Sequence, residues 1–112
     1  MEYKKRFDVE FLPQAREFLL SLDIKAKQKI ISNIRKSQGI KDEELFKKIS
    51  DEGIWEFRTE YNSVRYRLFA FWDETKKAFV IATHGIIKKT SKVPTKEIKK
   101  ALDIRKQYYK EK

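Results

Sequence analysis

Ile54-Trp-Glu-Phe-Arg-Thr59 opens the stretch of sequence that decides the fold. Apolar and charged residues alternate in it, so Trp55 and Phe57 lie on one side of a strand and Glu56 and Arg58 on the other. This alternation is typical of a strand with one face in the core and the other in solvent. Trp55 and Phe57 are therefore predicted to be core residues.

Two more strands are predicted directly after this one. Residues 64–72 are apolar and aromatic, with Arg65 and Arg67 on one face. Residues 79–83 are almost wholly apolar, as central strands are. Short polar segments turn the chain between the strands. The result is an antiparallel meander of three strands, after which a loop is expected to start at His84.

Helical patterns precede this meander. A first strand is predicted over residues 3–9, and Pro13 then suits the first turn of a helix. Asp23 can cap a second helix and Gly39 can end it, which makes an N-terminal helical hairpin. Residues 40–52 are predicted as a loop with at most one helical turn. The apolar faces of the two helices contain Phe11, Ala15, Phe18, Leu19, Leu22, Ile30, Ile31 and Ile34.

A last helix is predicted to begin at Pro94 and Thr95. Its outer face is rich in lysine, and its inner face contains Ile98, Ala101, Leu102, the stem of Arg105 and Tyr108. The order of one strand, two helices, three strands and one helix predicts an α+β fold, with helices packed on a single sheet. We expect one domain over residues 1–112.

Composition excludes several classes of protein. The chain has 112 residues, of which 40% are hydrophobic, and this suffices for one core. It contains no cysteine, which excludes a disulfide scaffold, a thiolate zinc site and a cysteine nucleophile, and which fits a reducing compartment. No apolar run approaches the roughly 18 residues needed to span a bilayer. The expected location is the cytoplasm, without a membrane partner.

The charge of the chain is strongly positive and unevenly distributed. The formal net charge is +10, and residues 86–112 contain ten Lys or Arg residues against three acidic ones. Such a field attracts phosphates or another polyanion. The alternative is a lysine-rich face that serves only solubility.

The residues that could carry chemistry are basic. A single histidine excludes catalytic sites and metal sites that need two, and no phosphate-binding glycine loop is present, so neither a metal nor a cofactor is expected. Neighbouring strands lie about 5 Å apart, so one sheet face and its edge can gather a basic cluster. Arginines there would neutralise the charge that develops on an RNA phosphodiester, and a lysine or histidine would move the protons. The alternative at each position is an ordinary surface or turn residue. The candidates are Arg58, Arg65, Arg67, His84, Lys88 and Lys89.

Four blocks of the sequence together resemble the RelE/HigB toxin superfamily, and most closely its phage-derived, HigB-like branch. They are Ile-Trp-Glu-Phe-Arg at residues 54–58, Tyr-Arg-Leu at 66–68, His-Gly-Ile-Ile-Lys-Lys-Thr-Ser-Lys-Val-Pro at 84–94, and Glu-Ile followed by Ala at 97–101. The resemblance implies a RelE-like fold, similar to microbial RNases, with an antiparallel sheet, an N-terminal helical hairpin and a C-terminal helix. It also implies a type II toxin, an endoribonuclease that cleaves mRNA in the ribosomal A site by metal-independent 2′-OH attack.

The resemblance further implies roles for individual residues. Arg58 and Arg67 match positions that would stabilise phosphate charge, and a lysine or His84 would transfer protons, with Lys88 and Lys89 as the candidate lysines. The expected partner is a small helix-turn-helix antitoxin. Ile86 stands where the family usually has an aromatic residue, which argues against a base-stacking platform there. The expected RNA contacts are Arg65, Lys92 and Lys96.

Two other functions stay open at this point. One is a non-catalytic binding module, either a ParE-like gyrase poison or a basic adaptor that uses the last helix. The other is a toxin remnant that folds without being toxic.

Overall fold

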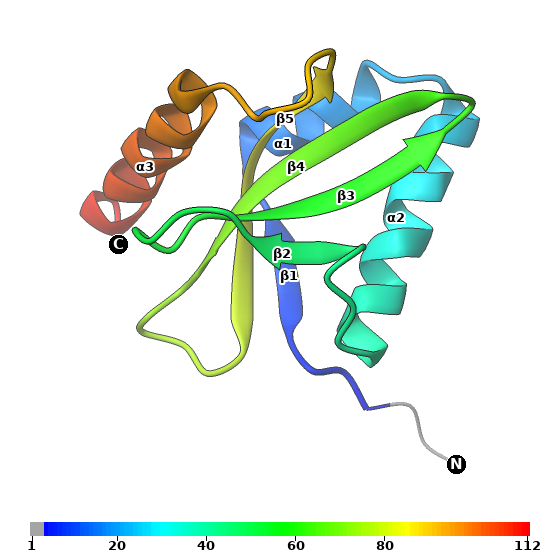
Figure 1. The fold of residues 1–112 in the computed structure, drawn as a ribbon. Helices are drawn as coiled ribbons and strands as arrows, with labels where there is room; N and C mark the ends of the chain where they lie inside the picture. Colours follow the sequence, from blue (N-terminus) through cyan, green and yellow to red (C-terminus); the bar gives the residue numbers. More distant parts are fainter. Residues whose placement is uncertain (1–3) are drawn as a thin grey trace.

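A five-stranded sheet with three helices makes up the fold in the computed structural model, which describes residues 4–112 (Figure 1). The strands lie in the order β1-β5-β4-β3-β2, which confirms the predicted α+β class. The pair β1 and β5 is parallel and the other pairs are antiparallel. The elements are β1 (Asp8–Phe11), α1 (Pro13–Leu20), α2 (Ile24–Gly39), β2 (Phe46–Lys48), β3 (Trp55–Tyr61), β4 (Val64–Trp72), β5 (Phe79–Lys88) and α3 (Thr95–Lys110).

The predicted meander is confirmed as β3, β4 and β5. Asn62 and Ser63 form the turn between β3 and β4, and both have positive φ angles, of 54° and 64°. A two-residue turn of this kind matches the right-handed twist of the strands that it joins. Phe57 is buried, and Trp55 packs against the same core, as the alternation predicts.

Helices cover both faces of the sheet. On one face, α1 and α2 contribute Ala15, Leu19, Ile30 and Ile34 to the larger core. On the other face, α3 packs over a smaller core that contains Phe69, Phe71, Ile81 and Ala101. Figure 1 shows α3 standing apart from α1 and α2. Since α3 packs mainly against β4 and β5, it leaves β3 uncovered on this face of the sheet.

The predicted boundaries of α2 are confirmed. The Asp23 side chain accepts a hydrogen bond of 3.0 Å from the Ala26 amide, and the helix ends at Gly39. The carboxylate satisfies one of the free amides of the first turn, which stabilises a helix by roughly 1 kcal/mol.

The first strand was predicted too early in the chain. Position 3 lies outside the described residues, and β1 begins at Asp8, whose amide donates to the Ala78 carbonyl. The Arg6 amide donates instead to the carbonyl of Gln38, at the end of α2. Arg6 is therefore bonded to the end of α2, and the pairing with the sheet begins at Asp8.

The prediction of a loop over residues 40–52 was partly wrong, because β2 lies within it. This edge strand has three residues and pairs with β3, with Phe46 opposite Phe57. Phe46 is buried, whereas Lys47 and Lys48 are exposed. One apolar position gives no detectable alternation, so the sequence alone cannot indicate such a strand.

The prediction of a loop starting at His84 was also wrong, because β5 continues to Lys88. The register changes from Leu68 opposite Gly85 to Ala70 opposite Ala82, so β5 has one residue more than β4 over this interval. Such a bulge reverses the alternation of faces. As a result, His84 faces α3, while Gly85 faces α1 on the other side of the sheet.

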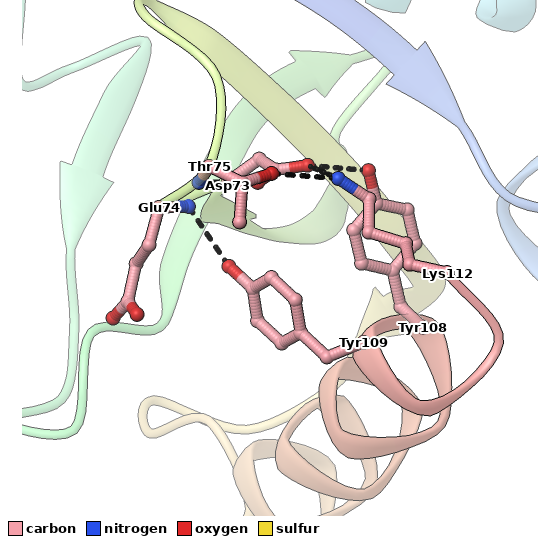
Figure 2. A network of polar contacts seen from close by, with 6 residues as sticks. All are labelled: Asp73, Glu74, Thr75, Tyr108, Tyr109 and Lys112. Carbon is pink, nitrogen blue, oxygen red and sulfur yellow. Dashed lines mark hydrogen bonds and ion pairs between the residues drawn. The ribbon is translucent and has the colours of Figure 1, made fainter.

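The end of α3 is attached to the turn after β4 (Figure 2). The Tyr108 hydroxyl and the Lys112 ammonium both donate to Oδ2 of Asp73, over 2.5 and 2.7 Å. The Tyr109 hydroxyl accepts a hydrogen bond of 2.9 Å from the Glu74 amide. These contacts fix the distance between the C-terminal part of α3 and the sheet.

Asp73 is the centre of this network. Burial raises the pKa of its carboxyl, but hydrogen bonds from Lys112, Thr75 and Tyr108 outweigh burial and hold the pKa well below its ordinary value. Burial and the contact with Asp73 raise the pKa of Tyr108. Asp73 therefore stays charged and Tyr108 stays neutral at neutral pH.

Candidate functional site

Four of the predicted basic residues lie on the same face of the sheet as α3, in the part of that face that the helix does not cover. Arg58 on β3 lies opposite Arg67 on β4, and Arg65 on β4 lies opposite Lys88 on β5. Directly opposed residues have Cβ atoms about 5 Å apart, at which distance like charges repel one another. The sheet therefore concentrates four cations within two rows, an arrangement that favours an anion.

Arg67 is the most buried of these cations, with 4% of its surface exposed. Its Nη1 donates a hydrogen bond of 3.0 Å to the Tyr66 carbonyl, and its Nε lies 3.5 Å from Oε1 of Glu56 without a hydrogen bond. Burial lowers its pKa, as do the charges of Arg58 and Arg65, whereas Glu56 raises it. Burying a cation with so little compensation is unfavourable, because charges in low dielectric need close partners.

Glu56 lies between the two opposed arginines. Its side chain is 5% exposed, and Oε2 lies 3.4 Å from the Nε of Arg58. Arg58 also reaches toward the loop before β2, where its Nη1 lies 4.0 Å from the carboxylate of Glu44. Sequence analysis did not single out Glu56 as functional, although its position two residues before Arg58 placed both on one face.

A cavity of ≈170 Å³ opens beside these residues. Side chains from β3, β4, α2 and the loop before β2 surround it, and polar groups predominate. At its edge, Asn33 of α2 donates a hydrogen bond of 3.1 Å to Thr59. The lining residues are Asn33, Glu44, Leu45, Arg58, Thr59, Glu60, Arg65 and Arg67.

Lys88 ends β5 next to this arginine cluster. Burial lowers the pKa of its ammonium, and the charges of Arg67, Arg58 and Arg65 lower it further, while Glu56 acts in the opposite direction. A lysine with a lowered pKa gives up its proton more readily than an ordinary surface lysine. Lys88 can therefore act as a proton donor at this site.

His84 lies elsewhere, under the start of α3, with 2% of its surface exposed. Its Nε2 is 3.1 Å from Oε1 of Glu97, its Nδ1 is 2.9 Å from Oγ1 of Thr83, and its ring packs against Phe69. Burial lowers its pKa, against the effect of the hydrogen bond with Glu97. Four residues along a strand separate His84 from Lys88 by roughly 13 Å. The structure does not bring the His84 ring into the arginine cluster.

The family model described as phage-derived protein Gp49-like (DUF891) matches residues 17–106. The chain belongs to this Gp49-like family. Its matched region contains the four sequence blocks and the whole arginine cluster. A phage-derived family was predicted from the sequence, and this is confirmed.

The fold of this Gp49-like protein is similar to that of a chain in the toxin–antitoxin complex RelBE2 from Mycobacterium tuberculosis. The TM-score is 0.57 at 18% sequence identity, and the match covers 73% of this chain and 98% of that chain. At this identity the similarity shows the fold, which is the predicted RelE-like one. No curated protein matches the chain.

Three further predicted residues of the Gp49-like chain lie beyond β5, in the segment that leads into α3. Lys89, Lys92 and Lys96 are exposed, and their side chains form no hydrogen bond or ion pair within residues 4–112. They extend the positive surface away from the arginine cluster. Unpaired surface lysines are suited to the phosphate backbone of a nucleic acid.

The described part of the chain contains neither a cluster of metal ligands nor a membrane-spanning helix. Across residues 4–112, no group of three or more His, Asp or Glu residues is placed to hold a metal ion. Over the same residues, no helix is both long and apolar enough to span a membrane.

Proposed function

We propose that this Gp49-like protein is the toxin of a type II toxin–antitoxin system and that it cleaves mRNA on the ribosome by metal-independent 2′-OH attack. The observation that carries the proposal is the environment of Arg67. This cation is nearly buried, its Nε forms no hydrogen bond, and three further cations surround it. A bound phosphodiester would supply further negative charge beside Arg67. This charge would offset the unfavourable burial of one cation among three others.

The cluster contains the groups that the reaction needs. Arg58 and Arg67 would stabilise the extra negative charge as the 2′-OH attacks phosphorus. The Glu44 carboxylate, at the rim of the cavity, would accept the 2′-OH proton, and Lys88 would donate a proton to the departing 5′ oxygen. The new bond joins O2′ to phosphorus and the P–O5′ bond breaks. The products are a 2′,3′-cyclic phosphate and a 5′-hydroxyl.

This assignment differs from the sequence-based hypothesis at three residues, because His84 and Lys89 leave the catalytic set and Glu44 enters it. His84 was a candidate for proton transfer, but a ring that is buried and bonded to Glu97 lacks access to RNA. We propose that His84 instead orients the first turn of α3 against β5. Lys89, Lys92 and Lys96 would contact RNA phosphates outside the cluster.

The proposed partners follow from charge and from fold. The net charge of +10 favours association with ribosomal RNA and mRNA, with cleavage in the A site, and ribosomes are cytoplasmic. Similarity to a chain of a toxin–antitoxin complex supports a cognate antitoxin, for which a helix-turn-helix protein is our proposal. Membership of the HigB-like branch is part of the same proposal.

Induced expression in bacteria tests the function. Primer extension on translated mRNA should show cuts within or between codons for the wild type, and a loss of about 100-fold or more in Arg67→Ala. Arg16→Ala is the matched control, because it removes an exposed arginine from α1. Thermal unfolding of each variant shows whether it is folded. Intact transcripts under a toxic wild type would refute the proposal.

A second candidate is a non-catalytic binding module. The exposed lysines of α3 favour it, because they can hold a polyanion without any chemistry. It predicts intact mRNA in the same experiment, with a DNA damage response if the target is gyrase. The two candidates therefore differ in one assay.

A further inference from the structure

Glu56 lies between Arg58 and Arg67 at the centre of the cluster. Each oxygen of Glu56 faces the Nε of one arginine, Oε1 that of Arg67 and Oε2 that of Arg58. One carboxylate therefore contacts the inner edges of two guanidinium groups that would otherwise repel each other across the strands.

The outer edges of the two guanidinium groups stay available. Nη1 of Arg67 donates to the Tyr66 carbonyl, and Nη1 of Arg58 is directed to the loop before β2. Within residues 4–112, Nη2 of neither arginine forms a hydrogen bond. A phosphodiester with two non-bridging oxygens can accept from two such donors, provided that the guanidinium groups are held side by side.

We infer that Glu56 is a positioning residue for the proposed cleavage: it holds Arg58 and Arg67 in register so that both meet the same phosphodiester. The inference rests on the proposed function. Glu56 does not itself bind the phosphodiester, because it is an anion and both of its oxygens face the Nε atoms of the two arginines.

Neutralising Glu56 has opposite effects on the cleavage rate if it is a simple counterion and if it is a positioning residue. If Glu56 only offset charge, its neutralisation would make the cluster more positive and would favour the anionic substrate and transition state. If Glu56 orients the arginines, its neutralisation would leave binding unchanged or tighter but would slow the chemical step. A misplacement of about 1 Å can reduce a rate by roughly 100-fold.

Glu56 also acts on Lys88, which supplies an independent readout. Its negative charge raises the pKa of Lys88. Removal of the charge therefore lowers that pKa, and the limb of the pH–rate profile that depends on Lys88 should move toward lower pH. A simple counterion would move this limb in the same way, so the limb reports the charge of Glu56 and the fall in kcat reports its positioning of the arginines.

The experiment measures cleavage of a defined mRNA by the full chain in a purified translation system, with Glu56→Gln as the main variant. We expect kcat to fall by about 10- to 100-fold without a rise in KM. Glu56→Asp keeps the charge but is one methylene too short to reach both arginines, and we expect an intermediate loss. Glu17→Gln, on the exposed side of α1, is the matched control.

Each outcome has one meaning. If wild-type protein cuts and Glu56→Gln cuts as fast or faster, the inference is wrong and the proposed function stands. If wild-type protein leaves the mRNA intact, both fail. If Glu56→Gln does not fold, as thermal unfolding would show, Glu56→Asp decides: undiminished kcat in Glu56→Asp would overturn the inference.

Discussion

The close approach of β5 to α1 at Gly85 gives a prediction whose magnitude follows from the structure. A Cβ atom added to Gly85 would lie 2.6 Å from Cγ of Phe18, well inside van der Waals contact. Because Cγ is close to the backbone, the ring cannot simply rotate away. Overpacking of this kind costs roughly 1–3 kcal/mol, and the lower chain entropy of alanine offsets up to about 1 kcal/mol. The nearest ring atom, Cδ2 of Phe18, would lie at only 2.2 Å, which places the cost in the upper half of that range. We therefore expect Gly85→Ala to lower the free energy of unfolding by about 1–2 kcal/mol.

Urea denaturation and thermal unfolding measure this loss. For a chain of 112 residues, about 1–2 kcal/mol corresponds to a decrease in Tm of roughly 4–8 °C. The control is the same substitution in a Phe18→Ala background, where the ring is absent and the cost of Gly85→Ala should vanish. An unchanged Tm in the single variant would refute the reasoning. An equal loss in both backgrounds would show that another contact is responsible.

Two further predictions concern groups that titrate. Asp73→Asn should lower the free energy of unfolding by roughly 1–3 kcal/mol at pH 7, because the buried carboxylate loses charged hydrogen bonds. The folded pKa of Asp73 is depressed, so its contribution is present above the unfolded pKa near 4 and is lost on further acidification. In Asp73→Asn, the free energy of unfolding should therefore decrease less steeply on acidification than in the wild type. An equally steep decrease would contradict the proposed role of the hydrogen bonds to Asp73. The folded pKa of His84 is also lowered, so wild-type stability should fall as the pH drops below about 6.5, and His84→Gln should abolish this dependence while mRNA cleavage persists. Loss of cleavage in folded His84→Gln would return His84 to the catalytic site.

The elements with a strong periodic pattern could be predicted from the sequence, and the weakly patterned ones could not. The meander was predictable because apolar residues alternate through β3, make up most of β4 apart from Arg65 and Arg67, and run without interruption through the start of β5. The end of β5 was missed because the bulge before Gly85 breaks the alternation. The edge strand β2 was missed because its only buried residue is Phe46.

The cationic half of the candidate site was predictable, whereas its acidic half was not. The alternation of residues and the order of the strands together predict that Arg58 and Arg67 lie on one face of the sheet. The role of Glu56 depends on distances to two neighbours, and that of Glu44 depends on the path of a loop that has no periodicity. The exclusion of His84 depended on the bulge, since a histidine in the expected loop would be accessible.

The chemistry of the cut ends tests the central claim most directly. Attack by the 2′-OH leaves a 5′-hydroxyl on one fragment and a 2′,3′-cyclic phosphate on the other, whereas hydrolysis by metal-activated water leaves a 5′-phosphate and a 3′-hydroxyl. Fragments produced in a purified translation system should accept label from polynucleotide kinase without prior dephosphorylation, and they should disappear in Arg67→Ala. Fragments with 5′-phosphates, or mRNA that stays intact, would contradict the account.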